Sequence, residues 1–217
     1  MTIDKDDLLN SIIESLDRIQ YIKLEDIPNI DLYMDQVTTF MDKKLKSATR
    51  NPEDDKILTK TMINNYAKND LLPPPEKKKY SKEHILLLIF IYYYKGILTI
   101  SDIQTLLNPL SERFFGNEEF GLSNVYKEVF SLEKEQVDVL KEDVISKFHV
   151  SKDTFEDAPE ESREFLQLFS FICMLSFDVY VKKLLIEKMV DSFGKAADGK
   201  KKDAKREKPE PEQNKKN

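Results

Sequence analysis

The chain of 217 residues is 40% hydrophobic and 34% charged, contains five glycines and carries a formal net charge of −6. This hydrophobic fraction can build a sizeable core, and the few glycines favour a helical protein of one or two domains over an all-β one. The net negative charge excludes a protein whose whole surface binds nucleic acid.

The N-terminal region predicts an amphipathic helix over residues 4–22. Its apolar residues recur at helical spacing on one side, namely Leu9, Ile12, Ile13, Leu16 and Ile19. The first ten residues are acidic early and contain no apolar run of the kind found in signal peptides, so we expect no secretory signal. Residues 27–30 form an extended link that Pro28 keeps from being helical.

Residues 32–45 predict the next helix, with Val37, Phe40, Met41 and Leu45 on its inward side. The connection that follows, residues 46–58, is long and contains an acidic run, Glu53, Asp54 and Asp55. An ordinary helix-turn-helix joins its two helices by about 3–4 residues. The connection is therefore longer than that motif requires.

A short helix after Thr59 carries the strongest candidate for a recognition surface. Thr59 is a good N-cap, and Leu58 and Ile63 are spaced for a hydrophobic staple. Ile63, Tyr66 and Ala67 recur at helical spacing and form an inward face. The opposite, polar face consists of Thr61, Asn64, Asn65 and Lys68. Asparagine can bond adenine twice and threonine can contact base edges, although the same pattern also fits a helix face that is merely solvated.

Residues 73–75 are all proline and end that helix, because proline cannot continue it. The segment that follows, residues 76–80, contains three lysines and is too short for anything but a tight turn or a small hairpin. Over residues 56–82 there are seven lysines against Asp70 and Glu76, a net of 7 − 2 = +5, so the rest of the chain carries −6 − 5 = −11. A basic face on an acidic body permits phosphate contact at that face, although an ordinary charge fluctuation would give the same count.

A buried helix is expected after the basic turn. Ser81 predicts its N-cap, with Tyr80 and Ile85 as a hydrophobic staple. Residues 85–94 are almost wholly apolar, so this helix must be covered on most sides. Gly96 can end it.

The middle of the chain predicts further helices. Ser101 and Gln104 match a capping box for a helix that ends near Leu107. We expect a loop over residues 108–122, which contain a proline and two glycines, and helix over residues 123–148, in one or two pieces.

The C-terminal region predicts one long apolar helix. After a turn at residues 151–158, Pro159 opens a helix that runs to about Phe193. Its wide apolar surface favours a homodimer through the C-terminal helices. Cys173 is the single cysteine, and within this apolar helix we expect a buried, inert thiol, which fits a reducing compartment. Residues 194–217 are rich in Lys, Glu and Pro and are expected to be disordered.

The sequence contains no catalytic or metal-binding pattern. His84 and His149 are the only histidines, and no His/Cys cluster, phosphate-binding loop or dinucleotide fingerprint occurs. We therefore expect a non-catalytic protein without a cofactor. Residues 85–94 and 165–181 are apolar but shorter than the ~20 residues that a membrane span requires, so we expect a cytoplasmic protein without membrane contact.

The order of these features resembles two known families. The series of Tyr66, Leu-Leu-Pro-Pro, basic turn, Tyr-Ser, apolar helix and Ile-Ser-Asp-Ile-Gln is similar to the MerR-type winged-helix DNA-binding domain. Over residues 27–107, the stretches IPNIDLYMDQV and ILTKTMINNYAKNDLLPPPEKKKYSKEHI closely resemble a bacterial domain-of-unknown-function family, the one numbered eighteen thirty-six.

The MerR-type resemblance implies roles for individual residues. Tyr66 stands at the second tyrosine of that family's Arg-Tyr-Tyr recognition motif, and Asn64 and Asn65 stand where the motif has its arginine and first tyrosine. Lys78 falls at the basic residue of the wing and Tyr80 at its closing tyrosine. The resemblance implies double-stranded DNA as the partner.

The sequence as a whole predicts an all-α protein with a winged helix-turn-helix (MerR-like) core, a small β wing and a C-terminal helical region. Its parts are an N-terminal helix (residues 1–26), the winged-helix domain (27–107), the helical region (108–193) and a charged tail (194–217). We expect a DNA-binding transcriptional regulator; the alternative is a protein-interaction module that keeps the fold without binding DNA. The residues expected to contact DNA are Thr61, Asn64, Asn65, Tyr66, Lys68, Lys77, Lys78, Lys79 and Tyr80.

Overall fold

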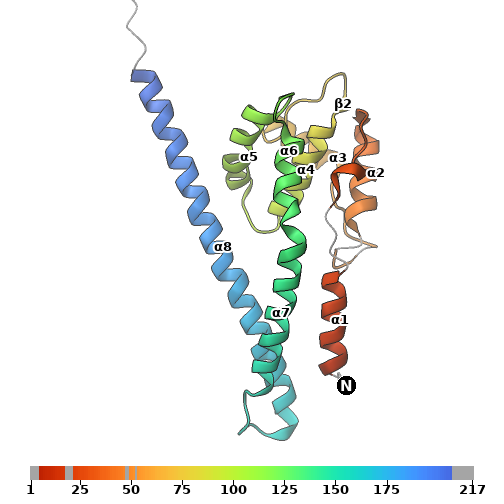
Figure 1. Cartoon of the computed structure of the whole chain (residues 1–217), viewed down its shortest axis with the longest axis vertical. Helices are drawn as coiled ribbons and strands as arrows, with labels where there is room; N and C mark the ends of the chain where they lie inside the picture. Colours follow the sequence, from red (N-terminus) through yellow and green to blue (C-terminus); the bar gives the residue numbers. More distant parts are fainter. Residues whose placement is uncertain (1–4, 18–21, 47–48, 52, 207–217) are drawn as a thin grey trace, which may run out of the picture.

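The computed structural model describes residues 5–17, 22–46, 49–51 and 53–206, which are mostly helical with one small antiparallel sheet (Figure 1). The elements in chain order are α1 (Lys5–Asp17), the 3-10 turn η1 (Leu24–Asp26), β1 (Leu32–Tyr33), α2 (Met34–Leu45), α3 (Lys60–Lys68), β2 (Lys79–Tyr80), α4 (Lys82–Tyr94), α5 (Ile100–Phe114), α6 (Leu122–Ser131), α7 (Glu133–Lys152) and α8 (Glu160–Arg206).

Helix α4 is the centre of the core. Ile85 to Ile91 are all buried, as the unbroken apolar run predicts, while Tyr92, Tyr93 and Tyr94 are half-buried. α5, α6 and β2 contact it. The helix begins at the predicted cap, where the backbone N–H of Ser81 donates to His84 Nδ1 at 3.0 Å.

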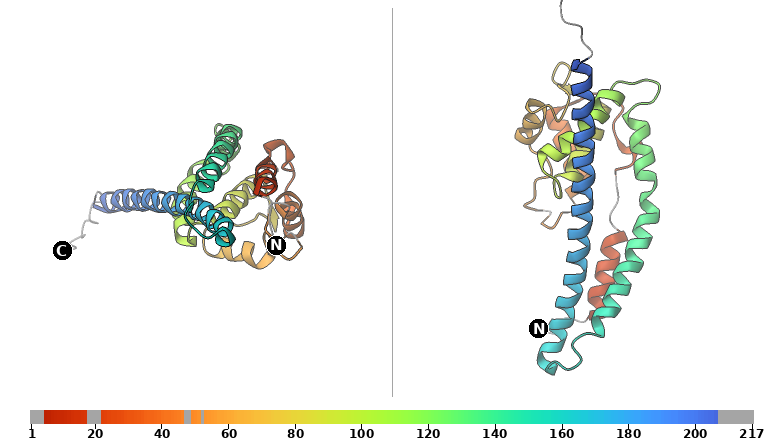
Figure 2. Two further views of the ribbon diagram at one scale, coloured as in Figure 1. Left: turned by 90° about the horizontal axis from the view of Figure 1, so that it is seen from below. Right: turned by 90° about the vertical axis from the view of Figure 1, so that its left-hand side faces the viewer.

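Helices α7 and α8 form a long antiparallel hairpin that projects from this globular part (Figures 1 and 2). Phe148 and Phe171 meet edge to face, with ring centroids 5.4 Å apart, and Lys147 pairs with Asp178 at 2.7 Å. The second half of α8 packs against α5, and α1 packs against α7. The predicted N-terminal helix is thus present over residues 5–17, while residues 4 and 18–21 of that prediction lie outside the described residues.

The small sheet pairs two segments that are far apart in the sequence. Leu32 is opposite Tyr80 and Tyr33 is opposite Lys79, in antiparallel register. The helix expected over residues 32–45 therefore begins only at Met34, because its first two residues are used as a strand.

Helix α5 differs from the prediction at both ends. Its N-cap is Thr99, whose Oγ1 accepts from the backbone N–H of Asp102 at 3.2 Å, and not Ser101. The helix also continues through Pro109 to Phe114, although a loop was expected from residue 108. Leu110 and Phe114 pack against the core, and this burial offsets the hydrogen bond that Pro109 removes.

Helix α8 is longer than expected. It continues to Arg206, so the expectation of a disordered tail is wrong for residues 194–206, and residues 207–217 lie outside the described residues. The thiol of Cys173 is exposed and not buried, because α8 turns Gln167 and Phe171 inward and Cys173 lies on another side. The helices within the described ranges all lack the combination of length and apolar content that crossing a bilayer requires.

Candidate nucleic-acid interface

The start of α3 is built as its sequence predicts. The Thr59 side chain accepts a hydrogen bond from the backbone N–H of Met62 at 3.1 Å, which caps the helix. Leu58 and Ile63 are both buried, in keeping with the predicted staple. The face opposite Ile63 is open to solvent, and its exposed residues are Thr61, Asn64, Asn65 and Lys68.

The basic turn projects two lysines from the surface. The backbone N–H of Lys79 donates to the Glu76 carbonyl at 2.8 Å, which closes a four-residue turn. Lys77 and Lys78, the two central residues, have φ of 48° and 66°. Positive φ at both centres is the pattern of a type I′ turn, which glycine and asparagine favour. An ordinary residue held in this region costs about 1–2 kcal/mol, so the turn is strained at two exposed lysines.

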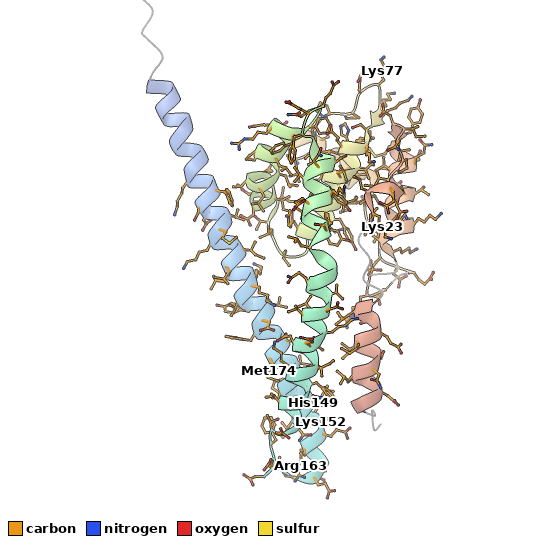
Figure 3. All side chains as sticks on the ribbon, in the orientation of Figure 1. Lys23, Lys77, His149, Lys152, Arg163 and Met174 are labelled. Atoms are coloured by element: carbon orange, nitrogen blue, oxygen red, sulfur yellow. The ribbon has the colours of Figure 1, made fainter. Side chains whose placement is uncertain are left out.

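Helix α3 and the basic turn converge on the junction between β1 and α2. Lys60, at the first position of α3, forms an ion pair with Asp35 at the start of α2. Lys79 Nζ lies 5.3 Å from the ring centroid of Tyr33, which stands opposite it in the sheet. β1 and the start of α2 therefore hold α3 and the basic turn at one end of the protein. Figure 3 shows Lys77 at the end opposite Lys152 and Arg163.

Two of the residues expected to contact DNA lie in the core. Tyr66 is 7% exposed and Tyr80 is 3% exposed, and burial raises the pKa of both phenols. Tyr66 occupies the inward face of α3, and Tyr80 is the strand residue opposite Leu32. Their rings therefore stabilise the fold and are not part of the exposed surface. Lys79 is half-buried, while the other expected contact residues are exposed.

The connection between α2 and α3 is anchored in the core and is not a tight turn. Its last residues, Ile57 and Leu58, are 1% and 3% exposed. Lys95 Nζ donates to the Ile57 carbonyl at 2.7 Å, and burial lowers the pKa of Lys95. α2 and α3 contact each other despite the long connection. Sequence reasoning missed this anchor, for which the apolar pair of Ile57 and Leu58 after an acidic run was the available signal.

The structure gives little support to two other kinds of site. Among the described residues, no group of three or more His, Cys, Asp or Glu is placed to hold a metal ion. A wide, mainly apolar hollow of about 340 Å³ lies beside α2, lined among others by Pro28, Leu32 and Phe40. Asp35, Gln36, Thr39 and Lys43 also line it, but it is wide open to solvent and so lacks the enclosure that buries most of a small ligand's surface.

Comparison with known proteins finds a family model that matches the globular part of the chain. Neither the curated proteins nor the solved structures yielded a match. Residues 22–129 match the family described as Domain of unknown function (DUF1836). This match spans η1 to α6 and so includes the sheet, α3, the basic turn and the central helix α4. The chain is therefore similar to this family over its globular part, and the match does not extend to α7 and α8.

Proposed function

We propose that this domain binds double-stranded DNA through the outer face of α3 and the turn at Lys77 and Lys78. The observation that carries the proposal is the turn itself. Two exposed lysines occupy a left-handed conformation that glycine would adopt at less cost. Strain of this kind is typical of ligand-binding segments, and two adjacent cations at a projecting tip are suited to a polyanion.

In this proposal α3 contacts the bases and the lysine turn contacts the phosphates. Asn64 and Asn65 lie on the exposed face of a capped helix that the core holds in place, and each amide can make two hydrogen bonds to an adenine edge in the major groove. Lys77 and Lys78 would contact phosphate and set the register of the helix on the duplex. In this proposal α2 and α3 act as a winged helix-turn-helix of MerR-like type, with the turn as its wing, and the protein regulates transcription.

Base recognition is tested by alanine substitutions on α3. A preferred duplex is first selected from a random pool with the native protein. Asn64→Ala and Asn65→Ala should each weaken binding to that duplex by ~1–3 kcal/mol and relax one base position, while binding to a random duplex barely changes. Asn10→Ala, on the exposed side of α1, is the matched control and should change neither. An equal loss on all duplexes would remove these residues from base recognition.

Phosphate contact is tested by salt dependence. Lys77→Ala with Lys78→Ala should weaken binding to every duplex, and the slope of log K against log salt should flatten by about 0.9 for each phosphate that the variant no longer neutralises. The double variant Lys127→Ala with Lys188→Ala removes the same charge from exposed sites on α6 and α8. This control should leave the slope unchanged. If the two double variants behave alike, the turn does not bind DNA.

A protein-interaction module is the second candidate, and the exposed apolar surface of α8 favours it. Ten large apolar residues of α8 are at least 48% exposed, and large exposed apolar surfaces mark interaction sites. The two functions are compatible, because α8 lies outside the DUF1836 segment.

A further inference from the structure

The first half of α8 has an apolar face that no described element covers (Figures 1 and 2). Its large side chains are between 48% and 69% exposed. They recur at helical spacing and form one surface, which we call the apolar stripe, consisting of Phe165, Phe169, Ile172, Phe177, Val179, Tyr180 and Leu184. Cys173 and Ser176, both exposed, lie among them.

The apolar stripe has the size of a protein interface. An aromatic side chain buries about 150–250 Å² when it is covered, and on that scale the exposed fractions amount to roughly 800 Å². Each partner in a standard interface contributes about 800 Å². The stripe is thus large enough for a stable contact with one other helix.

The charges at the two ends of the apolar stripe are opposite. Residues 165–177 contain no charged side chain, and Asp178 is turned away toward Lys147 on α7. Before the stripe, α8 carries three glutamates, Glu160, Glu161 and Glu164, against one arginine, Arg163, which bonds the Ala158 carbonyl. At its far end Lys182 and Lys183 are exposed, and Lys183 also pairs with Glu187 of its own helix. A helix with this distribution complements a copy of itself that runs in the opposite direction.

We propose that two copies of this chain associate through the apolar stripe as an antiparallel helix pair, with the twofold axis near Ile172 and Cys173. In this arrangement Glu161 stands opposite Lys183 of the partner subunit. A parallel pair would place Glu161 opposite its own equivalent, which repels it. A twofold contact uses the same patch on both copies, and the apolar stripe is a patch of this kind. The inference does not depend on DNA binding.

The oligomeric state tests the surface. The full chain should sediment as a dimer at tens of micromolar, and Phe169→Glu should raise the dimer Kd by at least about a hundredfold, because the twofold brings two buried charges together. Met189→Glu is the matched control. Met189 is 60% exposed against 52% for Phe169 and lies on nearly the opposite side of α8. Both variants replace exposed residues, so both should keep the native circular dichroism.

The orientation is tested by cross-linking with a short bis-maleimide. In a Cys173→Ser background, Glu161→Cys and Lys183→Cys should each fail to cross-link alone, because equivalent positions lie roughly 30 Å apart along the antiparallel pair. The two variants should cross-link when mixed. Self-cross-linking of Glu161→Cys overturns the antiparallel arrangement.

The dimer proposal fails if the native chain stays monomeric at tens of micromolar. It also fails if Phe169→Glu and Met189→Glu dimerise with the same Kd. A gel shift with the monomeric Phe169→Glu variant keeps this result separate from the proposed function. If the native chain is a monomer that binds DNA, the dimer proposal fails and the DNA proposal stands. If it is a dimer that does not bind DNA, the DNA proposal fails and the dimer proposal stands.

Discussion

Replacing Lys78 by glycine should stabilise the protein relative to replacing it by alanine. Both substitutions remove the same charge, but only glycine adopts the φ of 66° without strain. The left-handed conformation costs alanine about 1–2 kcal/mol, and the greater freedom of glycine in the unfolded chain returns about 0.5–1 kcal/mol of that. Lys78→Gly should therefore be more stable than Lys78→Ala by about 0.5–1 kcal/mol.

Thermal unfolding of the two variants measures this difference. In a chain of this size, 1 kcal/mol corresponds to about 2–4 °C in Tm. The same pair at Lys127 in α6 is the control, where glycine should be the less stable by about 1 kcal/mol because it is a poor helix former. The two Lys78 variants should lose the same affinity for DNA. If glycine at position 78 is no more stable than alanine, the turn stores no strain and the argument from strain to binding fails.

Three further outcomes are expected. Thr99→Ala should cost about 0.5–2 kcal/mol in urea unfolding, while Ser101→Ala costs less than about 0.5 kcal/mol, because Thr99 caps α5; the reverse order would contradict the cap. Ile63→Ala should lower the free energy of unfolding by about 2–5 kcal/mol, because Ile63 is fully buried. A decrease below about 1 kcal/mol would contradict its burial in the core. Burial lowers the pKa of His84 below its ordinary 6.5, so stability should be full above about pH 6.5 and fall as the solution is made more acidic. Between about pH 7.5 and 5.5, the free energy of unfolding measured in urea should fall less for His84→Gln than for the native protein. An equal fall in both proteins would show that His84 does not cause the pH dependence.

Local sequence rules predicted α3 and α4 well, because their caps and faces are decided by neighbours in the chain. Thr59 and Ser81 are at the expected caps, and Ile63 faces inward as its spacing predicts. The same rules misplaced the start of α5, since Ser101 and Gln104 match the capping pattern as well as Thr99 and Asp102 do. Only the fold decides between two such overlapping patterns.

Distant contacts account for the remaining differences. The strand at Leu32 and Tyr33 exists because residues 79–80 lie beside it, and no local signal indicates that pairing. Cys173 was expected to be buried because its helix has a wide apolar surface, but α7 covers only one side of α8. The exposed polar face of α3 could be predicted from the sequence. Tyr66 was expected to contact DNA, although its place on the inward face of the helix already implied that it would be buried.

The small sheet also constrains the order in which the domain can assemble. Synthesis proceeds from the N-terminus at about 5–20 residues per second, so Leu32 and Tyr33 have no strand partner until Tyr80 has left the ribosome. Closing so long a loop is entropically costly before other contacts form. We therefore expect the α2–α3 contact to form first and the sheet to close later, so that the strained lysine turn is completed only on a scaffold that is already folded.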